Sequence, residues 1–404
     1  MSSVAPRLSL PDAPVLVAGV RGAVLLSPDG TVESLSLAEA KRRAAAQRPI
    51  LCHRTAVAAR LGFEQLAGFD LLELFAFVCP ARFCIPTPKG LAEATGQPEP
   101  KGLEAEAEAL IEAARRLLLD LGEQVARETA ARAAELRGIA FTMARGGWSW
   151  GPGVLAALGV HGGHRGAGRV WERLPEIAEH APEPPAASHP VEPQEARERL
   201  ARMLGPGAEQ RPQQGDYASA ACHAFGPREH VGEPRVVLAE AGTGTGKTLG
   251  YIAPASVWAE KNQGTVWIST FTRNLQRQLD SELDRLFPDP SEKARKVVVR
   301  KGRENYLCLL NLEEMAQRLA LAPEDAAAVG LMSRWALATR DGDMVGGDLP
   351  GWLADLLGRH RVMGLADRRG ECIFAAAPIT TAASSSAPCG APAAPRSSSP
   401  TMRW

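Results

Sequence analysis

The sequence predicts an α/β protein in which a phosphate-binding loop joins a strand to a helix. An apolar run, 236–238, leads into a glycine-rich turn that ends in Gly246-Lys247-Thr248, where a helical pattern begins. Residues 198–300 alternate helical and strand patterns, which is typical of a parallel sheet. Residues 13–55 instead show short strands and turns followed by helical segments, which indicates a separate α+β part.

The loop 241–248 has the residue types that a P-loop requires. In such a loop, backbone N–H groups hold phosphates, the lysine reaches the β- and γ-phosphates, and the following hydroxyl binds Mg²⁺. Glycines allow the backbone to approach the anion closely. We therefore expect ATP and Mg²⁺ here, with Lys247 and Thr248 as catalytic residues. The other nucleotide-binding residues expected in the loop are Ala241, Gly242, Thr243, Gly244, Thr245 and Gly246.

Composition limits the class of protein. A length of 404 residues suggests two to three domains. Basic and acidic residues are equal in number, 46 each, so the net charge of the chain does not attract nucleic acid. Any DNA affinity must then come from local patches. Seven unevenly spaced cysteines do not form a secreted disulfide framework. No signal segment or long apolar run occurs, so we expect a cytoplasmic protein without a membrane partner.

Local patterns predict the elements on both sides of a proline-rich linker. Strands are expected at 14–18, 23–26 and 49–52, with a Pro28-Asp29-Gly30 turn after the second strand. Helices are expected at 55–61 and 70–78, and an amphipathic helix pair across 103–136. After the linker 181–190, buried strands are expected at 236–238 and 266–269.

Several motifs around the loop are shared with one family. The loop has the form A-x-x-G-x-G-K-T, with Ala241 where the plain motif has glycine, and Arg211-Pro-Gln-Gln214 lies about thirty residues upstream. A strand pattern at 266–269 ends in hydroxyl residues before a helix, and residues 301–308 read K-G-R-x-N-Y-x-C. These motifs resemble the DinG/XPD group of superfamily 2 iron–sulfur DNA helicases.

The resemblance implies a RecA-like first helicase lobe that uses ATP to unwind DNA with 5′→3′ polarity, on single-stranded or forked substrates. It implies that Gln214, in the context of Arg211, reads adenine. It also implies that the hydroxyl-rich turn and the following helix hold DNA phosphates. The candidate nucleic-acid contacts are Thr270, Thr272, Arg273, Arg295, Lys296, Arg300 and Lys301, with a solvated basic face as the alternative for the last four.

The resemblance also implies an iron–sulfur site, from which this chain departs. Cys308 matches the position of the first of the family's four ligands to a [4Fe–4S] cluster, and Cys372 matches the second. The spacing of these ligands matters because four thiolates must converge on one cluster. Ala377 stands at the third ligand position, no cysteine follows at the fourth spacing, and Cys389 does not fit the pattern. From residue 375 to 404 there is no acidic residue, and the composition is dominated by Ala, Ser and Pro.

A single lost nucleotide near the codon of Ala377 explains this tail. Restoring one base yields a reading with cysteines at both missing spacings and the next motif of the family. The alternative is a genuine low-complexity terminus. Turnover of ATP needs an acidic pair for Mg²⁺ and arginine fingers from a second lobe. Neither follows Thr248 in this sequence, so we expect a chain that binds ATP without hydrolysing it.

The N-terminal part loosely resembles a DnaQ-type 3′–5′ exonuclease of the RNase H-like class. Such nucleases need clustered carboxylates for two metals. Here the opening strand carries no acid, and only Asp70 fits a ligand position, where a helix N-cap is the alternative. We expect a degenerate, non-catalytic domain. The resulting assignment is a degenerate exonuclease-like domain at 1–96, a helical segment at 97–180, a linker at 181–197, the ATP-binding lobe with the start of the iron–sulfur insertion at 198–374, and an aberrant tail at 375–404.

Three functions remain open from the sequence. The first is an ATP-dependent DNA helicase of the DinG/XPD type. The second is a non-catalytic fragment that binds nucleotide and DNA, and the third is a 3′–5′ exonuclease with an accessory ATP site. DNA-stimulated ATPase activity separates the first from the second, and Mg²⁺-dependent strand degradation identifies the third.

Overall fold

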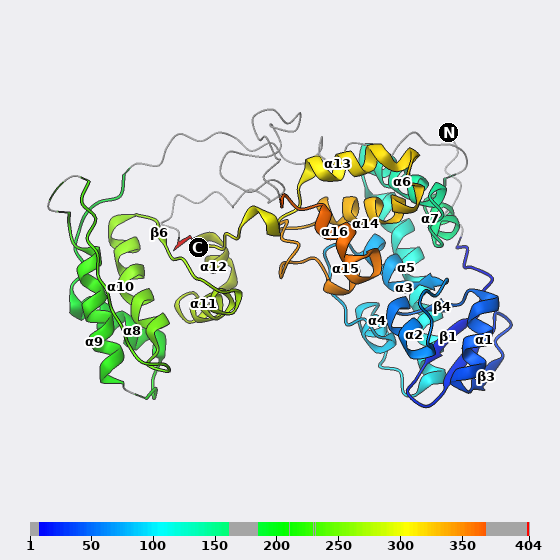
Figure 1. Cartoon of the computed structure of the whole chain (residues 1–404), viewed down its shortest axis with the longest axis horizontal. Coiled ribbons are helices and arrows are strands. Elements are labelled where there is room, and N and C mark those ends of the chain that lie inside the picture. The colour runs from blue at the N-terminus through cyan, green and yellow to red at the C-terminus, as the bar shows by residue number, and fades with distance from the viewer. Residues whose placement is uncertain are drawn as a thin grey trace. The chain divides into compact units, whose positions relative to one another are not determined.

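The computed structural model describes residues 8–160, 185–209, 211–228, 230, 232–368 and 402–403. They form two compact units (Figure 1). Unit 1 contains the described residues of 1–179 and 302–392, and unit 2 those of 180–301 and 393–404.

Unit 1 is built on a mixed five-stranded sheet with the order β3-β2-β1-β4-β5. Its strands are β1 (Val15–Ala18), β2 (Ala23–Leu26), β3 (Val32–Leu35), β4 (Ile50–Leu51) and β5 (Phe69–Asp70). Strand β2 is antiparallel to both β1 and β3, whereas β4 runs parallel to β1 and β5 runs parallel to β4. The predicted turn joins β2 to β3, where Gly30 has a φ of 90° that favours glycine. The strands expected at 14–18, 23–26 and 49–52 are confirmed, and the fold class is α/β.

Helices cover both faces of this sheet. Alternation along β1 directs Leu16 and Ala18 into one apolar cluster, together with α1 and α2, and directs Val15 and Val17 into another. The second cluster includes residues of α3 and of the long helix α5. The helices of this part are α1 (Leu37–Gln47), α2 (Arg54–Leu61), α3 (Leu71–Val78), α4 (Pro88–Ala94), α5 (Leu103–Arg127), α6 (Ala130–Arg145) and α7 (Gly151–Ala157). The helices expected at 55–61 and 70–78, and the helix pair across 103–136, are therefore present.

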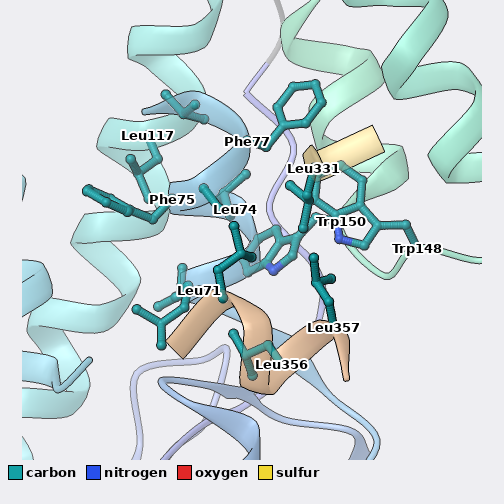
Figure 2. Packing of buried hydrophobic residues seen from close by; sticks show 14 of the residues in the cluster. Leu71, Leu74, Phe75, Phe77, Leu117, Trp148, Trp150, Leu331, Leu356 and Leu357 are labelled. Atoms are coloured by element: carbon teal, nitrogen blue, oxygen red, sulfur yellow. The ribbon is translucent and has the colours of Figure 1, made fainter. Parts of the chain in front are cut away.

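Helix α3 lies at the centre of the larger core, and all eight of its residues are buried. Figure 2 shows Leu71, Leu74 and Phe75 of this helix among side chains from distant segments, including Leu331 and the indoles of Trp148 and Trp150. Full burial of each such side chain contributes roughly 1.5–3 kcal/mol. The core therefore joins the sheet to residues more than two hundred positions later in the chain.

Those later residues form four further helices of unit 1. They are α13 (Leu309–Gln317), α14 (Ala326–Ala336), α15 (Gly351–Leu357) and α16 (Arg359–Gly364), with 3-10 turns at Arg303–Asn305, Arg318–Ala320 and Pro323–Asp325. Two long-range hydrogen bonds fix them: the Trp352 indole donates to the Cys84 carbonyl at 3.0 Å, and Arg334 Nε donates to the Phe77 carbonyl at 2.9 Å. The described residues 302–368 thus group with the N-terminal residues rather than with the P-loop segment, and the domain boundaries drawn from the sequence stay a prediction.

Unit 2 is a helical cluster around α10, which carries the P-loop at its start (Figure 1). Its elements are α8 (Pro193–Leu204), α9 (Pro212–Ala221), a 3-10 turn at Cys222–Phe225, α10 (Lys247–Asn262), β6 (Val266–Trp267), α11 (Arg273–Leu286), α12 (Pro290–Lys296), β7 (Val297–Val298) and β8 (Met402–Arg403). Helix α10 packs on α8 and α9, and its buried residues include Ile252 and Ala253. The short strand β8 lies between β6 and β7 and runs parallel to both.

The far end of α10 anchors the segment that precedes α8. Asn262 Oδ1 accepts a hydrogen bond from the His189 amide at 2.6 Å, and Asn262 Nδ2 donates to the His189 carbonyl at 3.0 Å. The Ala187 amide donates to the Asn262 carbonyl at 3.0 Å. Residues 187–189 are therefore fixed to the C-terminal end of α10.

The strand expected at 236–238 is not formed. Val236 is 72% exposed and Leu238 is 95% exposed, and neither belongs to a strand. A parallel strand needs hydrogen-bonded neighbours on its edges, and none of the described residues supplies one beside this run. The run expected at 266–269 keeps only β6, Val266–Trp267. The prediction of two buried strands is thus wrong for the first, and for the second it is correct only in that a strand of two residues forms, since neither of its residues is buried.

Candidate nucleotide-binding site

The P-loop turns directly into α10, as the sequence predicts. Gly244 and Gly246 have φ angles of 80° and 76°, a region that favours glycine, and Lys247 is the first residue of the helix. Thr245 Oγ1 donates to the Gly242 carbonyl at 2.9 Å and closes the turn. A helix that begins at a glycine-rich turn offers unpaired N–H groups and the positive end of its dipole to an anion.

Lys247 folds back over its own loop. Its Nζ donates to the Ala241 carbonyl at 2.7 Å and to the Gly242 carbonyl at 2.8 Å, and the side chain is half-buried. The ammonium is thus located inside the loop that would cradle phosphate. Thr248, the candidate Mg²⁺ ligand, is half-buried in the first turn of α10. Its side chain forms a hydrogen bond with the side chain of Tyr251.

Two side chains upstream hold the loop from the start of α9. Arg211 Nη1 donates to the Gly244 carbonyl at 2.6 Å, and Gln214 Nε2 donates to the Gly246 carbonyl at 2.8 Å. Gln214 is 4% exposed, and a Cβ placed on Gly246 would lie 2.2 Å from Gln214 Nε2. The structure therefore brings Arg211 and Gln214 to the loop. In this arrangement the Gln214 amide supports the backbone at the start of α10.

The candidate nucleic-acid residues lie on two segments of unit 2. Thr272 caps α11 by accepting from the Leu275 amide at 3.2 Å, and Thr270 is half-buried two residues earlier. Arg273 begins α11, and its side chain lies outside what the structure describes. A hydrogen bond from Gln276 Nε2 to the Arg300 carbonyl, at 3.5 Å, links the two segments.

The four basic candidates differ in environment. Arg295 is exposed, whereas Lys296 pairs with Glu292 at 2.7 Å and lies over the Phe287 ring. The Arg300 guanidinium lies 5.9 Å from the centre of the Trp267 ring, and Lys301 is half-buried. The sequence did not single out Trp267 or Phe271, which are 61% and 98% exposed. The signal for them was present: both are aromatic residues beside the hydroxyl-rich turn.

The structure describes one of the two predicted iron–sulfur ligands, so the pairing of Cys308 with Cys372 stays a prediction. Cys308 is 2% exposed at the start of α13, and Cys372 lies outside the residues that the structure describes. Within the described part of the chain, no group of three or more His, Cys, Asp or Glu side chains could hold a metal ion.

Asp70 serves as a helix cap. It is fully buried, and its carboxylate accepts from the backbone amides of His53, Arg54 and Leu72 at 3.1, 2.5 and 3.0 Å. Burial raises the pKa of Asp70, and these N–H donors act against that rise. A carboxylate saturated by three backbone donors has little capacity left for a metal. This agrees with the N-cap alternative for Asp70.

Among the described residues, no helix is both long and apolar enough to span a bilayer.

Comparison with known proteins gives partial matches to helicases. The chain is 34% identical to the ATP-dependent helicase DinG of Mycobacterium tuberculosis over 155 residues, which is 34% of this chain and 22% of that protein. It is 41% identical to the ATP-dependent DNA helicase YoaA of Escherichia coli over 149 residues, covering 36% of this chain and 21% of that helicase. It is 33% identical to the 3′-5′ exonuclease DinG of Bacillus subtilis over 162 residues, covering 38% and 16%.

These matches have a limited extent. The matched segment spans about a fifth of the length of the curated relatives. No family model matches the chain, and no solved structure matches it significantly. Identities of 34–41% with proteins named as helicases agree with the P-loop geometry described above. Over about a third of its length, this chain is similar to the ATP-dependent helicases DinG and YoaA.

Proposed function

We propose that this chain binds ATP at residues 241–248 and carries the nucleotide-binding part of a DinG-type ATP-dependent DNA helicase, with 5′→3′ polarity implied by the resemblance. The observation that carries the proposal is the loop itself. Lys247 lies inside a glycine-rich turn whose last residue, Gly246, has a left-handed φ and leads directly into a helix. The relatives named as ATP-dependent helicases support the same function.

The roles of the loop residues follow from their placement. Backbone N–H groups of 242–248 would bind the phosphates, and Lys247 would exchange its two carbonyl partners for phosphate oxygens. Thr248 would hold Mg²⁺, which neutralises phosphate charge when bound. Arg211 and Gln214 would keep the loop in shape, and the free amide oxygen of Gln214 would be the group available to adenine.

We further propose that the chain binds nucleotide without turning it over. Hydrolysis requires an acidic pair that holds Mg²⁺ and positions water. In the sequence after Thr248, no apolar run ends in Asp-Glu. DNA would be the partner, with the basic segment 295–301 contacting its backbone. The [4Fe–4S] cluster at Cys308 and Cys372 stays a prediction from the resemblance.

Lys247→Ala tests this function. Loss of a charge-assisted hydrogen bond to phosphate costs about 1.5–3 kcal/mol, so we expect the affinity for a fluorescent ATP analogue to fall about ten- to a hundredfold. The control is Lys89→Ala, which removes an exposed ammonium of unit 1 that pairs with Glu99 at 3.2 Å. Equal affinities of wild type and Lys247→Ala would overturn the nucleotide site. DNA-stimulated ATP hydrolysis by the 404-residue chain would overturn the binding-only proposal.

A further inference from the structure

Unit 2 leaves two aromatic rings open beside its basic segment. Phe271 is 98% exposed and Trp267 is 61% exposed. An aromatic side chain gains most when its large apolar surface is covered, so a nearly bare phenyl ring marks a place where another molecule is expected to pack. Three residues lie between Trp267 and Phe271, so the backbone positions of the two rings are at most about 14 Å apart.

The backbone beneath Phe271 is fixed. The next residue, Thr272, caps α11 through the Leu275 amide at 3.2 Å, and its carbonyl accepts from the Gln276 amide at 3.0 Å. Gln276 in turn binds the Arg300 carbonyl through its side chain at 3.5 Å. The exposed ring is therefore carried by a capped turn that is connected to the basic segment.

Trp267 is already engaged in one stacking contact. The Arg300 guanidinium lies 5.9 Å from its ring centre, within the range of a cation–π interaction. The ring nevertheless keeps most of its surface open. Such a pair presents an aromatic face and a positive charge at one place, which is the chemistry that a nucleotide base with its phosphate requires.

The charged side chains of the basic segment 295–301 and of the two residues before it are all positive. Residues 293–301 contain five basic side chains and no acidic one: Lys293, Arg295, Lys296, Arg300 and Lys301. Lys293 is neutralised by Asp280 and Asp284 at 3.0 and 2.6 Å. Lys296 is neutralised within its own helix by Glu292. The excess of basic over acidic residues in the segment favours an anionic partner, and the open rings favour one with aromatic faces.

We propose that Phe271 and Trp267 form a stacking platform for the bases of single-stranded DNA, with Arg300 as the adjacent positive charge. Single strands offer unstacked base faces, whereas the bases of a duplex are covered by their neighbours. This inference rests on the proposed function, which makes DNA the partner. It adds the aromatic contacts to the bases.

The test uses the full chain and two labelled oligonucleotides of equal length, an oligo(dT) and an abasic strand with the same backbone. Removing a stacking ring is expected to weaken oligo(dT) binding about 5- to 150-fold in a fluorescence anisotropy titration. Phe271→Ala should show this loss and should leave the affinity for the abasic strand unchanged. Phe271→Trp should retain binding to oligo(dT). Because the ring is 98% exposed, these changes should not alter the melting temperature.

The matched control is Leu321→Ala, which removes an apolar side chain of unit 1 that is 89% exposed. It should bind both strands as the wild type does. Equal binding of oligo(dT) by Phe271→Ala and wild type overturns the stacking platform and leaves nucleotide and DNA binding in place. If the wild type binds neither strand, the DNA part of the proposed function fails as well, and the binding of the ATP analogue then shows whether the nucleotide site stands alone.

Discussion

Glu73 is an acidic residue in the core of unit 1. It is 4% exposed, accepts a hydrogen bond from the Trp148 indole at 3.0 Å, and pairs with Arg54 at 3.0 Å. Burial raises the pKa of Glu73 from 4.5 to about 7, Arg54 acts against the rise, and the nearby Asp70 adds to it. The folded state therefore holds the proton of this carboxyl more tightly than the unfolded chain does.

This shift predicts a pH dependence of stability. Because the folded pKa lies above the unfolded value, the contribution of Glu73 is fully present below pH 4.5 and is lost as the pH rises through about 7. Its full size is up to about 3 kcal/mol. We expect Glu73→Gln to flatten the fall in unfolding free energy between pH 5 and pH 8, measured by urea denaturation. A slope equal to that of the wild type would contradict the assignment.

At the scale of single residues, the P-loop motif predicts part of the nucleotide-binding site. The order of glycines, lysine and threonine predicts the turn and the start of α10, and both are found. Sequence spacing could not predict that the Gln214 amide would fill the space beside Gly246, since that contact depends on how α9 packs against α10. It also could not predict that Phe271 would be left bare, because exposure is decided by residues far away in the chain.

At the scale of elements, Asp70 connects two helices. Its carboxylate caps α3 through the Leu72 amide and binds the amides of His53 and Arg54, at the start of α2. The Trp150 indole donates to the Asp70 carbonyl at 2.7 Å, so the same residue also ties in the segment before α7. One side chain thus sets the relation between the two helix starts.

Asp70→Ala should therefore destabilise unit 1. Three backbone donors would lose a buried partner, at about 1–3 kcal/mol each, so the loss of unfolding free energy should be at least about 3 kcal/mol. Asp70→Asn, which keeps one acceptor oxygen, should lose less. Chemical denaturation monitored by circular dichroism measures both. An unchanged stability together with the loss of a Mg²⁺-dependent nuclease activity would instead support the exonuclease alternative.

The elements that the sequence predicts well are those decided by local pattern. Short apolar runs and the turn at Gly30 predict β1 and β2, and helical spacing predicts α5 and α6. The run 236–238 has the composition of a buried strand, yet it stays unpaired because strand formation depends on neighbours supplied by other parts of a chain. Strand β5 was missed because it has only two residues, and β3 was missed because it alternates exposed with half-buried residues and so lacks an apolar run.

At the scale of the whole molecule, the chain has two units with separate cores. Unit 1 buries α3 among helices from both ends of the described sequence, and unit 2 buries α10 among α8, α9 and α11. The grouping of 302–368 with the N-terminal sheet could not be predicted from local patterns, because it depends on contacts such as that of Trp352 with Cys84. Domain assignment by linear motif order does not detect such long-range packing.

Separate cores predict separate responses to nucleotide. A ligand present at about 100 times its Kd stabilises the part that binds it by about 2.7 kcal/mol. We expect MgATP to raise the stability of unit 2 and to leave unit 1 unchanged, as read by hydrogen exchange with mass spectrometry. Protection should concentrate in residues 211–250 and should vanish in Lys247→Ala. Equal protection of both units would show that they do not respond separately.

The attachment of residues 187–189 to Asn262 has a mechanical consequence. Helix α10 is a rod about 24 Å long, with the phosphate loop at one end and this asparagine clasp at the other. A force on the chain that precedes α8 is therefore transmitted to the C-terminal end of α10 through the hydrogen bonds between His189 and Asn262. It does not pass through the glycine-rich turn at the other end of the helix. A force on residues 187–189 would thus act on the C-terminal end of α10 and not directly on the loop 241–248.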